Sequence, residues 1–227
     1  MNCYCNKRIL LLFVIVILFI SGCAEKQITL IPYNIAVHRN EQVSDNEHNR
    51  DVNIIKIDTD STHSDTIFNA ITQKFDTILD DYMNSVPYEF QNLVVDSTYC
   101  ENEEFLCLAV IASLPSQYSI PYETECIFWN RAEDKLYSLG EYLEIIGLDR
   151  TRIESSIDEA LSGKLGDLYK STIEGMFYLD NNIYFIIQVE SNFENGINAS
   201  ETMFYNYSSS ELILGKNFSG FNALIEG

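Results

Sequence analysis

The stretch FLCLAVIAS, residues 105–113, is apolar at eight of its nine positions. A strand with one wet face alternates apolar and polar residues, whereas a strand buried on both faces does not. This stretch is therefore the best candidate for the central strand of a sheet. Phe90–Ser97 before it and Thr124–Asn130 after it also have the composition of strands. Polar turns are predicted at Thr98–Glu103 and Arg131–Lys135.

One long amphipathic helix is predicted before these strands. Its apolar residues recur at helical spacing and form a single stripe: Ile67, Phe68, Ile71, Phe75, Ile78, Leu79 and Tyr82. Ser64 and Asp65 suit its first turn, as a cap and as a negative charge near the positive end of the helix dipole. Pro87 prevents the helix from continuing.

The segment before this helix is predicted to hold two strands, Ile28–Val37 and Val52–Ile57. Pro32 favours an edge position for the first of them, because proline cannot donate a backbone hydrogen bond to a neighbouring strand. The polar residues between them, Arg39–Asp51, are predicted to form a loop or spacer.

A pair of short helices is predicted in the second half. Ser138 and Glu141 have the spacing of a capping box, as do Thr151 and Glu154. Gly147 and Gly163 are the expected ends of the two helices.

The chain then returns to strands. Gly175–Leu179 and Ile183–Val189 flank the hairpin turn Asp180–Asn182, and Thr202–Tyr207 and Glu211–Leu214 follow. The predicted fold class is α+β, with a mainly antiparallel sheet packed with one long helix and a pair of short helices.

The N-terminus predicts export and lipidation. Lys7 and Arg8 precede the apolar run Ile9–Ile20, and Ser21-Gly22-Cys23 follows it. Basic, apolar and small-residue regions in this order are typical of a secretory signal. About 12 apolar residues fall short of the about 20 that span a bilayer, so an uncleaved anchor is the weaker alternative. Ile20, Ser21 and Gly22 before Cys23 form a lipobox, which predicts a lipidated Cys23.

The resulting domain layout has four parts. Residues 1–22 are the signal peptide, residues 23–50 the lipidated cysteine and a tether that can include a first strand, residues 51–215 the α+β domain, and residues 216–227 a tail. We expect the domain to lie outside the cytoplasm, attached to the membrane through Cys23. The abundance of Asn, Ile, Asp and Tyr is typical of a low-GC bacterium, so the host is expected to be Gram-positive.

The charge of the chain limits its partners. Removal of Lys7 and Arg8 with the signal leaves 12 basic against 34 acidic residues, a net charge of −22. Such a domain is repelled by nucleic acid and by anionic lipid. Basic proteins, cations and neutral ligands remain, although the charge alone would also keep an extracellular domain soluble.

Three cysteines remain in the mature domain besides Cys23: Cys100, Cys107 and Cys126. At most one disulfide can form among them. Cys107 and Cys126 both lie in apolar runs and could face each other, and three reduced thiols are the equally supported alternative.

No catalytic or cofactor motif occurs in the sequence. The GxSxG, HExxH, GxGxxG and Walker patterns are absent, as is any Cys/His cluster with zinc spacing. The three histidines, His38, His48 and His63, lie in polar segments near the N-terminus. We therefore predict no enzyme, no cofactor and no metal.

Two other interpretations concern particular side chains. The alternative function is an envelope hydrolase with a carboxylate pair, drawn from Asp58, Asp60, Asp80, Asp81, Glu123 and Glu125. Tyr118, Tyr122 and Trp129 form an aromatic group that would suit contact with a carbohydrate or a protein. Packing in the core is the competing explanation for these rings.

The order of elements resembles the DUF4163/DUF3298-type extracytoplasmic modules, which occur in the lysozyme-sensing anti-sigma factor RsiV and before some peptidoglycan deacetylases. The resemblance covers about residues 50–215 and rests on short motifs. These are Ile67-Phe68-Asn69-Ala70-Ile71 at the start of the helix, the turn and helix Asp134–Leu143, the hairpin Phe177–Phe185 and the closing strand Phe204–Leu212.

The chain departs from that family at Tyr118–Tyr122, where many members have a Gly-Ala-Ala-His-like segment. We also expect neither a transmembrane helix with a cytoplasmic anti-sigma segment nor a deacetylase domain. The resemblance implies a non-enzymatic binding or sensing module for a basic protein such as lysozyme, or for a cell-wall component such as peptidoglycan.

Overall fold

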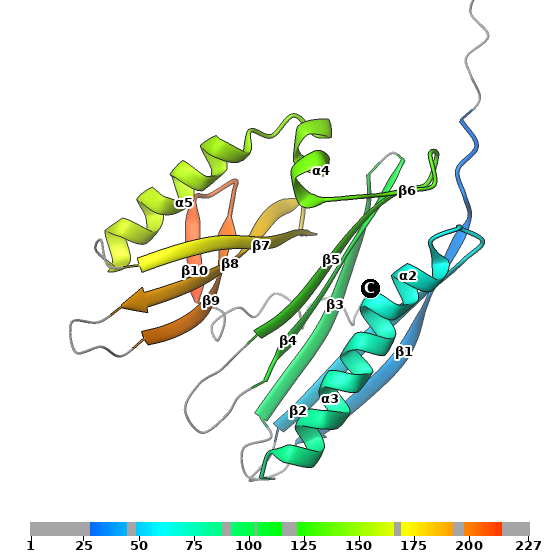
Figure 1. The fold of residues 1–227 in the computed structure, drawn as a ribbon, viewed down its shortest axis with the longest axis horizontal. Helices are drawn as coiled ribbons and strands as arrows, with labels where there is room; N and C mark the ends of the chain where they lie inside the picture. Colours follow the sequence, from blue (N-terminus) through cyan, green and yellow to red (C-terminus); the bar gives the residue numbers. More distant parts are fainter. Residues whose placement is uncertain are drawn as a thin grey trace, which may run out of the picture.

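The computed structural model describes residues 28–44, 49–87, 92–102, 104–114, 122–165, 169–192 and 198–214. The signal sequence, the lipobox and Cys23 lie outside these ranges. The described residues form two mostly antiparallel sheets and three helices, so the α+β prediction is confirmed. The strands are divided between two sheets rather than gathered in one (Figure 1).

The first sheet has six strands in sequence order: β1 (Tyr33–Ser44), β2 (Asn49–Thr59), β3 (Asn92–Asn102), β4 (Phe105–Ser113), β5 (Tyr122–Asn130) and β6 (Lys135–Tyr137). All neighbours are antiparallel except β2 and β3, which run parallel over a short stretch. The parallel pair arises because the long helix connects β2 to β3 and returns the chain to the end of the sheet where β2 begins. Strand β3 can therefore run in the same direction as β2.

The long helix consists of α2 (Ser64–Phe68), a π-helical turn η1 (Asn69–Gln73) and α3 (Lys74–Ser85). It lies over one face of the first sheet (Figure 1). The predicted stripe is the buried side, although Phe68 from that stripe is exposed. The cap differs from the prediction, because His63 occupies the N-cap position and its side chain makes no capping hydrogen bond to the helix. The helix ends before Val86 and Pro87, as expected.

The second sheet has four strands in the order β10-β9-β8-β7: β7 (Tyr169–Leu179), β8 (Asn182–Asn192), β9 (Asn198–Asn206) and β10 (Glu211–Leu214). Asp180 and Asn181 have φ of 49° and 61°. Positive φ at both central residues is what a two-residue hairpin of type I′ requires. The predicted hairpin is therefore confirmed.

Two helices connect the sheets, α4 (Leu139–Ile145) and α5 (Arg150–Leu165). The capping box at Ser138 and Glu141 is present, with both reciprocal hydrogen bonds. The prediction of a second capping box at Thr151 and Glu154 is wrong. The Asp149 carboxylate, not the Thr151 hydroxyl, accepts hydrogen bonds from the first free N–H groups of α5. Gly163 does not end this helix but lies inside it.

Strand β4 is the centre of the molecule. Its side chains alternate between a core under the long helix, with Leu106, Leu108 and Val110, and the opposite face, with Cys107 and Ile111. Strand β7 crosses that opposite face over β3, β4 and β5. Helix α5 packs on the outer side of the second sheet, which gives four layers (Figure 1). The predicted central strand is confirmed.

The polar loop predicted at Arg39–Asp51 is wrong. Residues 39–44 continue β1 and residues 49–51 belong to β2, so this segment is a long hairpin. A domain start at residue 51 would fall within β2, and the ordered sheet begins at Tyr33. Strand β1 is at the edge of the sheet, directly after Pro32, as the proline indicated.

Candidate functional site

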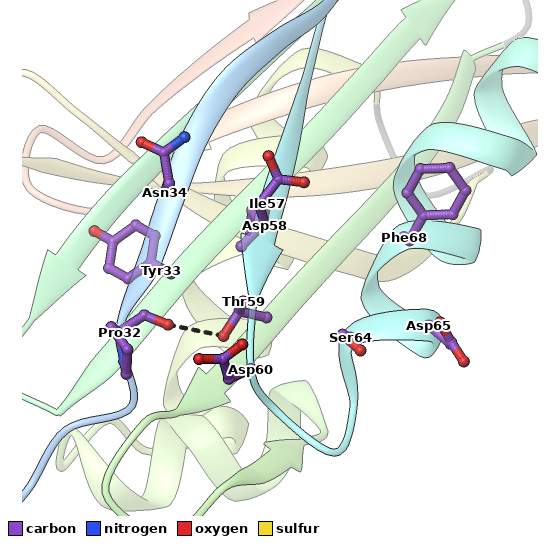
Figure 2. Close-up of a pocket in the computed structure, with 10 residues that line it drawn as sticks. All are labelled: Pro32, Tyr33, Asn34, Ile57, Asp58, Thr59, Asp60, Ser64, Asp65 and Phe68. Atoms are coloured by element: carbon purple, nitrogen blue, oxygen red, sulfur yellow. Dashed lines mark hydrogen bonds between the residues drawn. The ribbon is translucent and has the colours of Figure 1, made fainter.

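A groove of about 570 Å³ lies where the ends of β1 and β2 meet the start of the long helix (Figure 2). It is lined by Pro32, Tyr33, Asn34, Ile57, Asp58, Thr59, Asp60, Ser64, Asp65 and Phe68. The lining comes from three segments that are separate in sequence. They are brought together by the pairing of β1 with β2 and by the turn from β2 into the helix.

Three carboxylates make the groove negative. Asp58 is paired with Lys56, whose Nζ lies 3.0 Å from its Oδ2. Within the described residues, Asp60 and Asp65 have no side-chain hydrogen bond or ion pair, and both are exposed. Phe68 lines the same groove, and 44% of its surface is exposed. Open carboxylates next to an exposed aromatic ring suit an ammonium or guanidinium group.

The Tyr33 wall of the groove is held rigidly. The Tyr33 ring stacks under the Arg131 guanidinium at 4.6 Å and meets the edge of Trp129 at 6.5 Å. Burial, and then the neighbouring Glu101 carboxylate, raise the pKa of Tyr33 to about 12. The Thr59 hydroxyl donates a hydrogen bond of 2.9 Å to the Pro32 carbonyl across the two strand ends (Figure 2). This wall therefore presents a neutral phenol at physiological pH.

The turn from β2 into the helix is anchored by Asp134, which has φ of 51° in the β5–β6 turn. Its carboxylate accepts from the Ser61 hydroxyl at 2.5 Å, from the Thr62 N–H at 2.9 Å and hydroxyl at 2.7 Å, and from the Trp129 indole N–H at 3.2 Å. Desolvation raises the pKa of Asp134, but these hydrogen bonds outweigh it and hold the pKa well below its usual range. The carboxylate thus fixes one side of the groove to the first sheet.

Two acidic residues further along the same helix have ion-pair partners on β1. Asp76 lies 2.6 Å from the His38 ring and 3.5 Å from Arg39, and Asp80 lies 3.2 Å from Arg39. Asp81, next to Asp80, is exposed and has no ion pair within the described residues. The helix therefore carries both paired and unpaired acids beyond its first turn.

The predicted aromatic surface is not formed as expected. Trp129 is fully buried, with 0% exposure, and packs in the core under the long helix. Tyr118 lies outside the described residues. Tyr122 is half-buried and lines a second cavity, of about 390 Å³, between the two sheets. The competing core explanation is the right one for Trp129.

The acids considered for a hydrolase are spread over the molecule. Asp58 and Asp60 line the groove and Glu123 lines the second cavity. Asp80 pairs with Arg39, and Glu125 pairs with Lys74 at 2.8 Å. In the described part of the chain, no three His, Cys, Asp or Glu side chains gather where they would hold a metal ion.

The three thiols Cys100, Cys107 and Cys126 are free. The Cys107 thiol lies 3.1 Å from the Tyr142 hydroxyl, which lies 2.9 Å from that of Tyr178. Burial raises the pKa of Cys107 and of Cys126 to about 12. Both are therefore protonated and unreactive at neutral pH.

One buried acid was missed from the sequence. Asp96 on β3 is 4% exposed, and its carboxylate accepts from the Asn53 amide at 3.1 Å and from the Ser97 N–H at 2.7 Å. Desolvation is the main cause that raises its pKa to about 6. Ser97 beside it donates to the Asn53 carbonyl and accepts from the Ile55 N–H. These side chains satisfy backbone groups just beyond the last β2–β3 pair, Val52 and Val95.

Comparisons with known proteins give likenesses in structure but no match in sequence. No family model matches the chain, and no curated protein matches it. Among solved structures, it is similar to the crystal structure of a DUF3298 family protein from Pseudomonas aeruginosa PAO1. The TM-score is 0.42 and the identity 10%, over 82% of this chain and 91% of that one. No helix among the described residues is long and apolar enough to cross a membrane.

Proposed function

We propose that this chain is a lipid-anchored binding module of the cell envelope that captures a basic protein, such as lysozyme, at the groove. The observation that carries the proposal is a groove lined by the unpaired carboxylates of Asp60 and Asp65 and by the exposed ring of Phe68. Lysine and arginine side chains of a partner would find carboxylate acceptors and an aromatic surface in this groove.

The net charge of the mature chain supports the same kind of partner. A charge of −22 attracts basic proteins over distances of about 8 Å at physiological salt and raises their association rate. Contact affinity then depends on the few groups that meet in the groove. We therefore assign steering to the whole surface and retention to the groove.

Capture by the full-length chain tests this function. Detergent-solubilised full-length protein would be titrated with lysozyme over a series of salt concentrations. We expect saturable binding that weakens steeply as salt rises. A neutral protein of similar size and lysozyme with acetylated lysines are the controls, and neither should bind. Absent or salt-insensitive lysozyme binding would refute the proposal.

The membrane attachment is proposed from the lipobox. Two or more acyl chains on Cys23 would exceed the marginal membrane affinity of a single chain. We expect Cys23→Ala to accumulate as an uncleaved precursor or to be released, as membrane fractionation and mass spectrometry would show. A variant that is still cleaved and still membrane-bound would contradict the anchor.

A further inference from the structure

The three described cysteines lie on one face of the first sheet. Cys100 on β3 is directly opposite Cys107 on β4, and Cys126 on β5 is opposite Ala109, two residues along β4 from Cys107. Residues directly opposite each other in an antiparallel pair, and residues two apart on one strand, have their side chains on the same face. This face is the one turned away from the long helix. The strand register therefore brings together cysteines from three strands.

The same register makes Cys100 and Cys107 the better pair for a disulfide. Directly opposite residues of antiparallel strands have Cα atoms about 4.5–5.5 Å apart, and disulfides join residues whose Cα atoms are about 4.4–6.8 Å apart. Cys126 is diagonal to Cys107, and diagonal neighbours lie about 7–8 Å apart. Of the two pairs that include Cys107, the pair with Cys100 therefore has the spacing that a disulfide needs without movement of the backbone.

The two sulfurs of this pair differ in their access to solvent. Cys107 is 3% exposed, and its thiol lies 3.1 Å from the Tyr142 hydroxyl. Cys100 is only partly buried, and its thiol donates to the Glu101 carbonyl at 3.5 Å in an exposed position. An external reagent therefore reaches Cys100 first. Burial, and then the charge of Glu101, raise the pKa of Cys100, so this first step is slow at neutral pH.

We propose that Cys100 and Cys107 form a reversible cross-strand disulfide in the β3–β4 hairpin, by exchange with an external disulfide compound. Cys100, after losing its proton, attacks one sulfur of that compound, and the displaced sulfur takes up a proton and leaves as a thiol. Cys107 then attacks the Cys100 sulfur of the mixed disulfide, and the second thiol leaves with the Cys107 proton. The two cysteines lose two electrons, which reduce the external disulfide to two thiols.

The second step is favoured by position. Cys107 is protonated at neutral pH and is shielded from external reagents. A mixed disulfide on the directly opposite residue, however, is held next to it at a high effective concentration. This offsets the small ionised fraction of Cys107.

The disulfide would exchange one link across the molecule for another. In the reduced chain, the Cys107 thiol contacts Tyr142 of α4, whose hydroxyl lies 2.9 Å from that of Tyr178 on β7. A Cys107 sulfur bonded to Cys100 turns away from Tyr142, so oxidation replaces a contact between layers by a covalent link between β3 and β4. The expected export would place the pair in a compartment where disulfides persist. The pair does not depend on capture at the groove.

Equilibration of the folded full-length chain with mixtures of reduced and oxidised glutathione tests the pair. The remaining thiols are then alkylated and the chain is cut after glutamate, which places the three cysteines in separate peptides, 90–101, 105–123 and 126–133. We expect mass spectrometry to find 90–101 joined to 105–123 in oxidising mixtures, with Cys126 alkylated. The link should be lost when the mixture is made reducing.

Two variants distinguish this pair from the diagonal one. Cys126→Ala removes the diagonal thiol and should form the link as the unmodified chain does. Cys100→Ala keeps Cys107 and Cys126, and these two should both remain open to alkylation after unfolding. Circular dichroism would show that both variants are folded. A link between Cys107 and Cys126, a Cys100 that binds glutathione without closing onto Cys107, or no link at any glutathione ratio would overturn the proposal.

Discussion

Acidic residues lie near the start of the long helix and further along it, and two of the latter differ from the former in having ion-pair partners. Near its start, Asp60 and Asp65 have no ion pair among the described residues and line a groove. Further along, Asp76 and Asp80 are paired with His38 and Arg39 of β1. The total charge of a chain therefore does not show where its binding surface lies. The positions of its few basic residues are more informative, because a carboxylate that already has an ion-pair partner binds a cationic group of another protein less strongly.

The largest effect on stability is expected from Asp134→Ala at the groove. This substitution removes the carboxylate that holds the turn from β2 into the helix. The fully buried Trp129 indole N–H would lose its acceptor, and an unsatisfied buried donor costs about 1–3 kcal/mol. Urea unfolding should show this loss in the free energy of unfolding. Asp81→Ala, an exposed substitution at the other end of the helix, is the control and should stay within about 0.5 kcal/mol. Equal stability of the two variants would show that the anchor is unimportant.

An ionised carboxylate without an ionic partner keeps its solvation at the surface but loses it in the interior. Asp96 is the buried example, and its effect on stability reports the free energy of that desolvation. Its pKa in the folded state, about 6, lies above the ordinary value of 3.8, so its contribution to stability is present below about pH 4 and is lost as pH rises through about 6. Asp96→Asn should remove that loss. We expect the variant to be more stable than the unmodified chain by up to about 3 kcal/mol at pH 7.5 and similar to it at pH 4.

Urea unfolding at both pH values makes this comparison. Asn206→Asp, which adds a carboxylate at another mostly buried position, provides a matched test in the opposite direction and should lower stability at pH 7.5. A stability difference for Asp96→Asn that is the same at pH 4 and pH 7.5 would mean that Asp96 ionises normally.

Neutralising the groove should weaken capture without weakening the fold. Asp60→Asn/Asp65→Asn removes the two open carboxylates, and we expect about tenfold lower affinity for lysozyme, equivalent to about 1.4 kcal/mol. Asp81→Asn/Glu159→Gln changes the net charge by the same amount at sites away from the groove. It should alter affinity much less, through steering alone. Equal losses in the two double variants would show that only the overall charge matters.

The smallest effect is expected where the acids are already paired. Arg39→Ala removes the ion-pair partner of Asp80. Glu41 keeps Arg50 and Asp76 keeps His38 as partners. Because partly exposed ion pairs contribute little, the free energy of unfolding should fall by less than about 1 kcal/mol at low salt, and by less still at high salt. Urea unfolding in the two salts would test this, with Lys56→Ala at the groove end as the comparison. A loss above about 2 kcal/mol would show that this end is structurally essential.

Local signals predicted much of the fold. The apolar run of β4, the box at Ser138 and Glu141, and the Asp180-Asn181 turn each act within a few residues, and each was found. The hairpin of β1 and β2 was missed because its charged residues indicate solvent. In the structure, His38 and Arg39 from it find acidic partners on a helix almost 40 residues away.

The groove and its anchor could not be predicted for the same reason. Asp134 lies in a polar turn whose sequence has no feature that indicates a structural role. Its partners Ser61 and Thr62 are more than 70 positions away in the sequence. For Trp129 the aromatic neighbours left both a surface role and core packing open, and its alternation with Ile127 on β5 is the signal that favours the core under the helix. Asp58 and Asp60 were noted as candidate acids, but only the paired strands show that they share a groove with Phe68.

Carbodiimide labelling of carboxylates, read by mass spectrometry with and without lysozyme, tests the central claim most directly. We expect bound lysozyme to protect Asp60 and Asp65 in the full-length chain, and to leave Asp81 and Glu159 as reactive as before. Unchanged labelling of Asp60 and Asp65 under conditions where lysozyme is bound would contradict the groove as the site of capture.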